Sequence, residues 1–266
     1  EPMLDINDFM QTVDGQGVIC EGPACPNLAA PHAEIRIVGD SDPASALLPP
    51  LFRAFAEQRG LIFEADANSL LDARILDPES REELARISFQ PLPPPVASAA
   101  LEAGEADLKL SFQPDPDFTT HSLAMDALVA IVAPENPTPE ISTVDLARVL
   151  AGEIDNWSAI GGPDMPIVLH ALMPDSDMQV ALSERFGAPL ATAVMHPSQQ
   201  SLANAVAHDP WAVGITGRAN ILPAQEIPLT DSCGFPLLPT ALSVKAEDYP
   251  LALPVTLLAP KRRLPL

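Results

Sequence analysis

The sequence is poor in positive charge. Its 266 residues include 14 Lys and Arg against 36 Asp and Glu, which gives a formal net charge of −22 and a pI near 4.3. Binding to nucleic acid needs clustered Lys and Arg to release counterions, and docking on an anionic lipid surface needs the same charge. We therefore expect neither nucleic acid nor a membrane surface as a partner.

Long hydrophobic runs are also missing. The longest nearly unbroken ones, residues 127–134 and 251–260, fall short of the ~20 residues that cross a bilayer, so we expect no membrane insertion. Aromatic residues make up 5% and include a single tyrosine, which disfavours aromatic cages and base-stacking surfaces. Hydrophobic residues nevertheless make up 47%, enough for a packed core in one large domain or two medium ones.

Cysteine is scarce, and only two of the three cysteines are close in sequence. Cys20 and Cys25 have a spacing that can close a small disulfide loop; the alternatives are a bond from Cys233 to one of them, or three buried thiols. A disulfide would indicate an exported protein. No signal peptide is visible, as in a processed or trimmed chain. The five histidines lack metal-ligand spacing, and we expect no metal and no cofactor.

Proline is abundant, with 31 of 266 residues, over twice the usual share of ~5%. Scattered prolines indicate a fold with many loops between short elements. The pattern predicts strands at 33–38, 61–65, 85–90, 106–112, 124–133, 167–172, 191–196, 211–216 and 255–259. It predicts helices at 43–59, 96–103, 142–151, 177–186 and 198–208. This alternation indicates an α/β protein with largely parallel sheets, and Trp157 and Trp211 fall in stretches typical of packing.

The first strand runs into Gly39-Asp40-Ser41, which is similar to the first block of the GDSL hydrolases. That chemistry would make Ser41 a nucleophile and needs an Asp-x-x-His base near the C-terminus. The last histidine is His208, and no suitable aspartate precedes it. An ordinary helix start, with Ser41 or Asp42 as the N-cap, is the simpler interpretation.

The middle of the chain carries a longer pattern. Residues 123–137 read LAMDALVAIVAPENP; a predicted helix then leads to LAGEIDNW at 150–157 and to GGPD at 161–164. This order resembles the phosphate-type periplasmic solute-binding proteins of ABC transporters. Weaker matches extend the resemblance over roughly 33–260. The cysteine segment and DSCGFPL at 231–237 resemble an alphaproteobacterial subgroup in which this domain precedes an OmpA-like domain, and we expect the chain to stop short of that domain.

The resemblance implies a two-lobed α/β fold of the type II periplasmic-binding class, with hinge crossovers between the lobes. Residues 1–32 would be an irregular segment, residues 33–122 with 216–266 the first lobe, and residues 123–215 the second lobe. It also implies a non-catalytic protein of the periplasm or cell envelope. Its partners would be a small solute or ion, an oxyanion among them, and an ABC permease or another envelope component.

In this family, three loops at helix N-termini point N–H groups at a dehydrated oxyanion. The matching loops here are 39–42, 111–113 and 172–178, which gives the candidate ligand-binding residues Asp40, Ser41, Asp42, Ser111, Phe112, Asp175, Ser176, Asp177 and Met178. The third loop departs from the family's Arg-x-x-Gly-Ser-Gly-Thr: Leu172 replaces the arginine, Asp175 and Asp177 replace the glycines, and Met178 replaces the threonine.

These departures place four carboxylates in the loops where the family binds an anion. A like-charge contact at 4 Å costs ~4 kcal/mol at an effective dielectric near 20, more than the ~0.3–1 kcal/mol contributed by each helix dipole. We therefore expect phosphate binding to be weakened or the ligand to be changed. Two alternatives stay open: an acidic site for calcium or an amine, and a degenerate fold that serves as an interaction module beside an OmpA-like domain.

Overall fold

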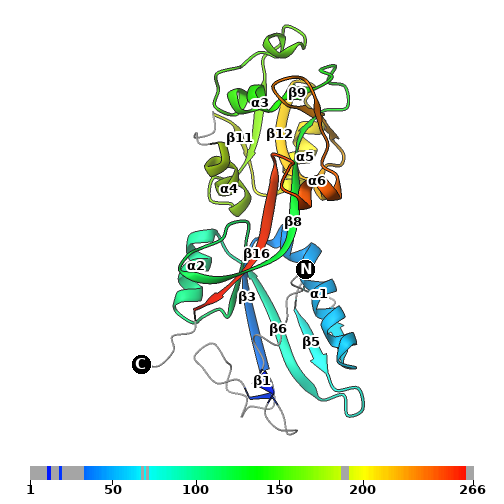
Figure 1. The fold of residues 1–266 in the computed structure, drawn as a ribbon, viewed down its shortest axis with the longest axis vertical. Helices are drawn as coiled ribbons and strands as arrows, with labels where there is room; N and C mark the ends of the chain where they lie inside the picture. The colour runs from blue at the N-terminus through cyan, green and yellow to red at the C-terminus, as the bar shows by residue number, and fades with distance from the viewer. Residues whose placement is uncertain are drawn as a thin grey trace. The chain divides into compact units, whose positions relative to one another are not determined.

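The computed structural model describes residues 11–12, 18–19, 33–66, 69, 72–186 and 192–261. The chain forms two compact units: unit 1 combines Glu1–Leu123 with Val255–Leu266, and unit 2 is Ala124–Pro254 (Figure 1). Both chain crossings fall inside strands, β8 (Phe118–Val132) and β16 (Ala252–Pro260). The sequence analysis assigned 216–266 to the first lobe, whereas in this division residues 216–254 belong with unit 2.

Unit 1 is a mixed sheet with helices packed on it. The strand order is β16-β7-β3-β6-β5-β4, where β3, β6 and β7 are parallel and the other pairings are antiparallel. The bounds are β3 Ala33–Gly39, β4 Ile62–Ala65, β5 Ala73–Leu76, β6 Glu83–Pro91 and β7 Leu108–Ser111. Helix α1 (Ser41–Gln58) packs on β4, and α2 (Pro94–Glu102) packs on β7 and β3. A short pair, β1 (Gln11–Thr12) and β2 (Val18–Ile19), is antiparallel.

In unit 2 the strand order is β11-β10-β12-β8, with β13 also paired to β8. Strands β10, β11 and β12 are parallel, and β8 is antiparallel to β12 and β13. The bounds are β10 Val168–Leu172, β11 Val194–His196, β12 Ala212–Gly217 and β13 Gln225–Glu226. A small sheet joins β9 (Ile141–Ser142), β14 (Leu229–Thr230) and β15 (Pro236–Leu237).

Local sequence signals correctly place the starts of α3 (Thr143–Leu150), α4 (Asp177–Phe186) and α5 (Gln199–Ala207) in unit 2. Unit 2 also contains α6 (Ala241–Lys245) and the 3-10 turns η2 (Trp157–Ile160) and η3 (Arg218–Asn220). Ser142 and Ser198 are the N-caps of α3 and α5, and each side chain accepts a hydrogen bond from a backbone N–H of the first turn. The sequence missed α6 and the small sheet, whose elements are too short for a periodic signal.

The core confirms the apolar run predicted as a strand and the packing role of Trp157. Residues 127–133 of the β8 segment are all buried. The Tyr249 hydroxyl donates to the carbonyl of Leu128 at 2.9 Å. Trp157 is 0% exposed, and its Nε1 donates to the carbonyl of Trp211 at 2.9 Å. Apolar packing of this kind removes the indole from any role as an exposed stacking surface.

The strands pair in a mixed pattern and not in a largely parallel one, since β4, β5, β8 and β16 all pair antiparallel. The prediction of mainly parallel pairing was wrong because β5 was missed and because β8 runs antiparallel to β12 and β16 to β7.

Cys20 and Cys25, the two cysteines expected to form a disulfide, lie outside the described residues. Cys233 is exposed and free, so the alternative that buried this thiol is wrong, and a bond from Cys233 to either of the other two stays a prediction.

No helix within the described residues is long and apolar enough to cross a membrane.

The parallel strands locate the region where a ligand is expected. Their carboxyl ends meet at one edge of a sheet, and ligands of open α/β proteins bind at this edge. In unit 1 this edge carries the starts of α1 and α2 and the residues that follow β7. In unit 2 it carries the starts of α4 and α5 and the residues that follow β12.

Candidate functional site

The first candidate loop follows β3, and a side chain of the loop accepts a hydrogen bond from the loop's own backbone. Gly39 has a φ of +138°, and a Cβ at this position would lie 2.2 Å from the carbonyl oxygen of Leu110, so only glycine fits against β7. The N-cap of α1 is Asp40, whose carboxylate accepts from the backbone N–H of Asp42 at 2.9 Å. The expectation that Ser41 or Asp42 caps this helix was wrong, because the helix already begins at Ser41.

The second loop follows β7, the strand beside β3 in the sheet. Ser111 is 1% exposed, and its Oγ accepts from the backbone N–H of Gln113 at 3.1 Å. Its carbonyl accepts from the hydroxyl of Thr256 at 2.9 Å. Phe112 is 1% exposed, so its side chain is part of the core and offers no surface to a solute.

The third loop lies in unit 2 and leads into α4. The Oγ of Ser176 accepts from the backbone N–H of Gln179 at 3.2 Å, so Ser176 acts as a cap. Asp175 is exposed, whereas Asp177 is 4% and Met178 0% exposed. Leu172, at the position of the family's arginine, is 4% exposed. An apolar residue packed into the core at this position cannot supply a positive charge to a ligand.

All three loops therefore share the same kind of internal hydrogen bond. Each has a backbone N–H that already donates to a side-chain oxygen of its own loop, from Asp40, Ser111 or Ser176. Unit 1 brings Asp40, Ser41 and Asp42 close to Ser111 and Phe112, because Gly39 is paired with Leu110 in adjacent strands. The residues of the third loop belong to the other unit. Donors used in this way are less available to an oxyanion.

Three features near these edges were missed by the sequence analysis. Lys109 on β7 is 6% exposed, and its Nζ donates to the Oγ of Ser98 at 2.9 Å. The Nε2 of Gln179, in the first turn of α4, is buried and has no hydrogen-bond partner. The third is a close contact between His170 and His196. A lysine at an alternating strand position looks solvent-facing, and only the helix that covers it shows otherwise.

His170 on β10 and His196 on β11 form a stacked pair. Their ring centroids are 5.0 Å apart and the ring planes are nearly parallel, at 11°, and Nδ1 of His170 lies 2.8 Å from Nε2 of His196. Burial lowers the pKa of His170 from its usual 6.5, His196 lowers it further, and Asp209 opposes the shift. Burial also lowers the pKa of His196. The pair is therefore held neutral at physiological pH.

Asp126, in the first part of β8 that belongs to unit 2, is another perturbed group. Burial raises its pKa, and a hydrogen bond from the backbone of Ala127 opposes this. Neither Asp126 nor the histidines belong to a metal cluster, since the described residues include no group of three or more His, Cys, Asp or Glu that could hold an ion. The calcium hypothesis therefore gains no support from the described residues.

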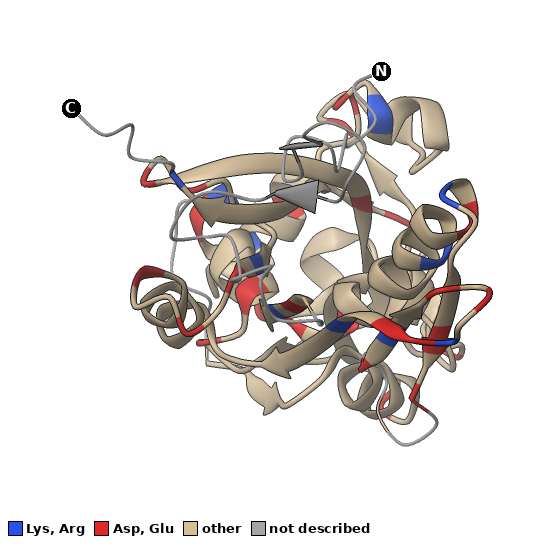
Figure 2. Cartoon of the chain, turned by 90° about the horizontal axis from the view of Figure 1, so that it is seen from below, with Lys and Arg blue, Asp and Glu red and all other residues tan. Residues whose placement is uncertain are grey.

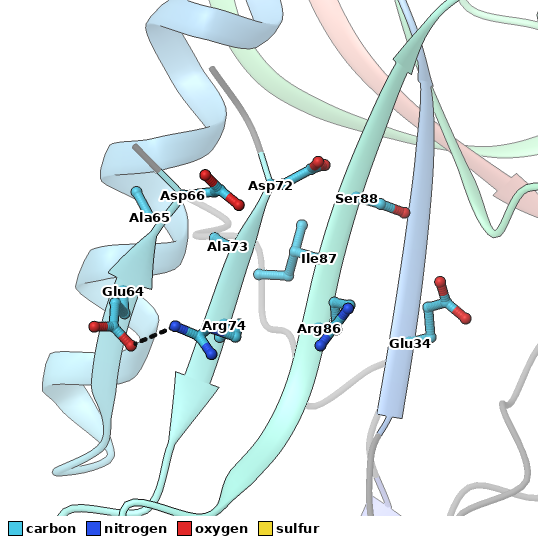
Figure 3. Close-up of a pocket in the computed structure, with 10 residues that line it drawn as sticks. All are labelled: Glu34, Glu64, Ala65, Asp66, Asp72, Ala73, Arg74, Arg86, Ile87 and Ser88. Carbon is cyan, nitrogen blue, oxygen red and sulfur yellow. Dashed lines mark hydrogen bonds and ion pairs between the residues drawn. The ribbon is translucent and has the colours of Figure 1, made fainter. Parts of the chain in front are cut away.

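A depression of about 540 Å³ lies elsewhere in unit 1, over strands β3 to β6 (Figure 3). It is lined by Glu34, Glu64, Ala65, Asp66, Asp72, Ala73, Arg74, Arg86, Ile87 and Ser88. Figure 3 shows the side chains of Glu64, Arg74, Arg86 and Glu34 in one row across four strands, which agrees with the strand register.

Both arginines of this depression are already paired. Arg74 forms an ion pair with Glu64 at 3.0 Å, and Arg86 forms one with the neighbouring Glu83 at 2.9 Å. The lining carries more carboxylates than arginines, and none of its residues is a candidate from the three loops. Acidic residues are also spread over many other elements of the chain (Figure 2). The depression is therefore an acidic part of the sheet surface whose two arginines are not free to bind an anion.

Comparison with known proteins identifies relatives of this fold. The phosphate-binding protein PstS of Bacillus subtilis is 27% identical over 125 residues, which cover 45% of this chain and 41% of that protein. PstS of Borreliella burgdorferi is 48% identical over 44 residues, 16% of each chain. The chain thus matches less than half the length of these curated relatives.

Solved structures agree on the architecture. An ABC-type phosphate transport receptor from Vibrio cholerae aligns with a TM-score of 0.63 at 19% identity, over 85% of this chain and 86% of that one. A putative phosphate ABC transporter substrate-binding protein from Clostridium perfringens, solved with bound phosphate, aligns with a TM-score of 0.64 at 15% identity, over 86% of each chain. These matches confirm the expected two-lobed α/β fold. The PBP superfamily domain matches residues 96–262, more than half of the sequence, and the chain therefore belongs to the PBP superfamily.

Proposed function

We propose that this protein is a non-catalytic solute-binding protein of the phosphate-binding type whose anion site has diverged, so that it binds phosphate weakly or binds another solute. One observation carries the proposal: in each of the three loops a side chain of the loop itself occupies a backbone N–H. The relatives named above are binding proteins for phosphate and not enzymes. Ser41 forms no hydrogen bond with a histidine among the described residues, which leaves the hydrolase hypothesis without a base.

Electrostatics supports the same conclusion. Asp40, Asp42, Asp175 and Asp177 add negative charge to loops that lack the family's arginine, at Leu172. A single like-charge contact at 4 Å costs ~4 kcal/mol at an effective dielectric near 20. Partial exposure and salt reduce this value, but each helix N-terminus returns only ~0.3–1 kcal/mol. Phosphate binding is expected to be weak on this balance.

We place the protein in the periplasm or cell envelope of its organism, with an ABC permease as the partner of a functional binding protein. A second function is favoured by the burial of Leu172, Phe112 and Met178. Loops whose side chains have become part of the core suit a degenerate scaffold that presents a surface to an envelope partner, beside an OmpA-like domain. The two functions differ in whether any small solute stabilises the protein.

A thermal-shift series with phosphate, sulfate, calcium and amine solutes at millimolar concentration tests the proposal. A ligand present at a hundredfold its Kd stabilises the fold by ~2.7 kcal/mol, and each kcal/mol raises the midpoint by roughly 2–4 °C for a chain of this size. A small phosphate shift, or a larger shift with another solute, fits the proposal. A large shift with phosphate alone contradicts the divergence of the site, and no shift with any solute favours the scaffold.

Replacing Asp175 gives a sharper test, because this exposed carboxylate stands where the family has glycine. Asp175→Gly should increase the shift caused by phosphate. Glu135→Gly is a matched control, since Glu135 is also an exposed acid in a turn of unit 2. Equal phosphate responses in wild type and both variants would show that the added charge is not what weakens the site.

A further inference from the structure

Lys109 is a buried cation at the centre of β7. The chain has only three lysines, at 109, 245 and 261. Lys109 is 6% exposed, and its Nζ donates one hydrogen bond, to the Oγ of Ser98 at 2.9 Å. None of the ion pairs among the described residues includes Lys109. An ammonium has three donors, and the described residues supply a hydrogen-bond acceptor for one of them.

The surroundings of Lys109 are apolar. In the sheet it lies between Val38 of β3 and Leu258 of β16, which are both buried. Helix α2 covers this face, where Ala97 and Ala100 pack with Val38. The first turn of α2 holds no acidic residue, and its N-cap, Pro93, forms no side-chain cap. Among the residues that the structure describes, none forms an ion pair with this ammonium.

Lysines are almost never buried to this extent without a charged partner, because removing an unpaired ion from water costs free energy. An anion close to Lys109 would offset this cost. Lys109 also lies two residues before Ser111 on the same strand, and side chains two apart in a strand point to the same face. The Lys109 side chain therefore lies on the same face of β7 as the side chain of Ser111, the first residue of the second candidate loop.

We propose that Lys109 is the cationic contact for an oxyanion group of the solute. This inference rests on the proposed solute-binding function. Ser98 holds the ammonium in place, and the two remaining N–H groups of Nζ bind the anion. The oxyanion is either free phosphate or a phosphate group carried by a larger solute. A charge-assisted hydrogen bond of this kind changes affinity by about tenfold or more.

An alternative role for Lys109 is purely structural, with its methylene groups filling space under α2 and its head group anchored by Ser98. The two roles predict opposite effects of Lys109→Met on the unliganded protein. Methionine keeps the apolar volume and removes an unpaired charge. If Lys109 serves an anion, the variant unfolds a few degrees higher than wild type, as expected when a functional strain is relieved. If its role is structural, loss of the contact to Ser98 lowers the midpoint.

The experiment measures thermal midpoints of wild type and Lys109→Met, alone and with inorganic phosphate or phosphorylethanolamine. Lys261→Met is the matched control, because Lys261 is an exposed lysine of the same unit. We expect Lys109→Met to raise the unliganded midpoint and to reduce the anion affinity at least about tenfold, while Lys261→Met changes neither. The larger of the two wild-type responses identifies the source of the oxyanion.

A lowered unliganded midpoint of Lys109→Met overturns the inference, and so do four further outcomes. If Lys109→Met responds to anions like wild type, the inference is wrong but solute binding remains. The same holds if wild type is stabilised by a solute without an oxyanion and by neither probe. A wild type that responds to no solute removes the proposed function as well. If Lys109→Met fails to fold, Lys109→Arg decides, because it keeps the charge: a folded arginine variant that retains part of the anion response supports the inference, and one that loses it overturns it.

Discussion

Two variants of Asp40 can separate the two effects of its carboxylate at the start of α1. The carboxylate caps the helix by accepting from the backbone N–H of Asp42 at 2.9 Å. It also adds negative charge to the first candidate loop. Asp40→Ala removes both the cap and the charge. Asp40→Ser removes only the charge, because serine caps helices about as well as aspartate.

The expected magnitudes differ between stability and binding. Loss of an N-cap costs about 1 kcal/mol, and loss of a favourable charge at a helix N-terminus costs a further ~0.3–1 kcal/mol. Asp40→Ala should therefore lower the unfolding free energy by about 1–2 kcal/mol, or roughly 3–6 °C in midpoint. For binding, the like-charge cost at 4 Å is ~4 kcal/mol. Relief of about a third of this cost corresponds to an about tenfold lower Kd for phosphate, and we expect this decrease in both variants.

Urea unfolding measures the first effect and calorimetric titration with phosphate the second. Asp115→Ala is the matched control, since Asp115 makes the same kind of contact, to the backbone N–H of Asp117 at 2.9 Å, in an exposed turn without a helix. An Asp40→Ala protein as stable as wild type would refute the capping role. Unchanged phosphate affinity in Asp40→Ser would refute the claim that charge in this loop weakens the site.

Three further predictions concern stability. Gly39→Ala should destabilise unit 1 by at least about 2 kcal/mol in urea unfolding, because the new Cβ meets the carbonyl of Leu110 at 2.2 Å and φ is +138°; a cost below 0.5 kcal/mol would contradict this contact. The pKa of His170 and His196 is lowered in the fold, so the unfolded chain takes up protons first as pH falls below about 6.5 and stability is lost on acidification. Unfolding curves from pH 8 to 5 check this, and His196→Gln should weaken the pH dependence; an unchanged profile in that variant would rule the pair out as the cause. Tyr249→Phe should cost about 1–3 kcal/mol by leaving a buried carbonyl unsatisfied, and the same measurement would expose an error if stability did not change.

Much of the fold could be predicted from local patterns. The helix predicted at 177–186 matches α4, and Ser142 and Ser198 cap the helices where the sequence placed their starts. A cap depends on a side chain and a backbone group three residues apart, so a short stretch of sequence contains the whole signal. The apolar run that became β8 was equally clear, since a strand buried on both faces has few polar residues.

Contacts between distant residues escaped prediction. Strand β5 has four residues and is fixed by pairing with β4 and β6, and its own sequence is too short to indicate a strand. The alternation around Lys109 is the same for an exposed face and for one covered by a helix. The approach of His170 to His196 depends on the parallel register of β10 and β11, which no local pattern contains.

Patterns in the sequence were enough to predict the helix starts, the apolar strands and the resemblance to phosphate-type periplasmic solute-binding proteins, and the composition argues against nucleic acid as a partner. The same patterns located the three loops and their unusual aspartates. Which groups these loops leave available depends on the tertiary structure, because burial and hydrogen bonding involve neighbours far along the chain. It assigned the cap of α1 to Asp40, placed Leu172 in the core, and enclosed the charge of Lys109 under α2. Packing sets the free energy of a buried charge, and only the packed fold reveals that cost.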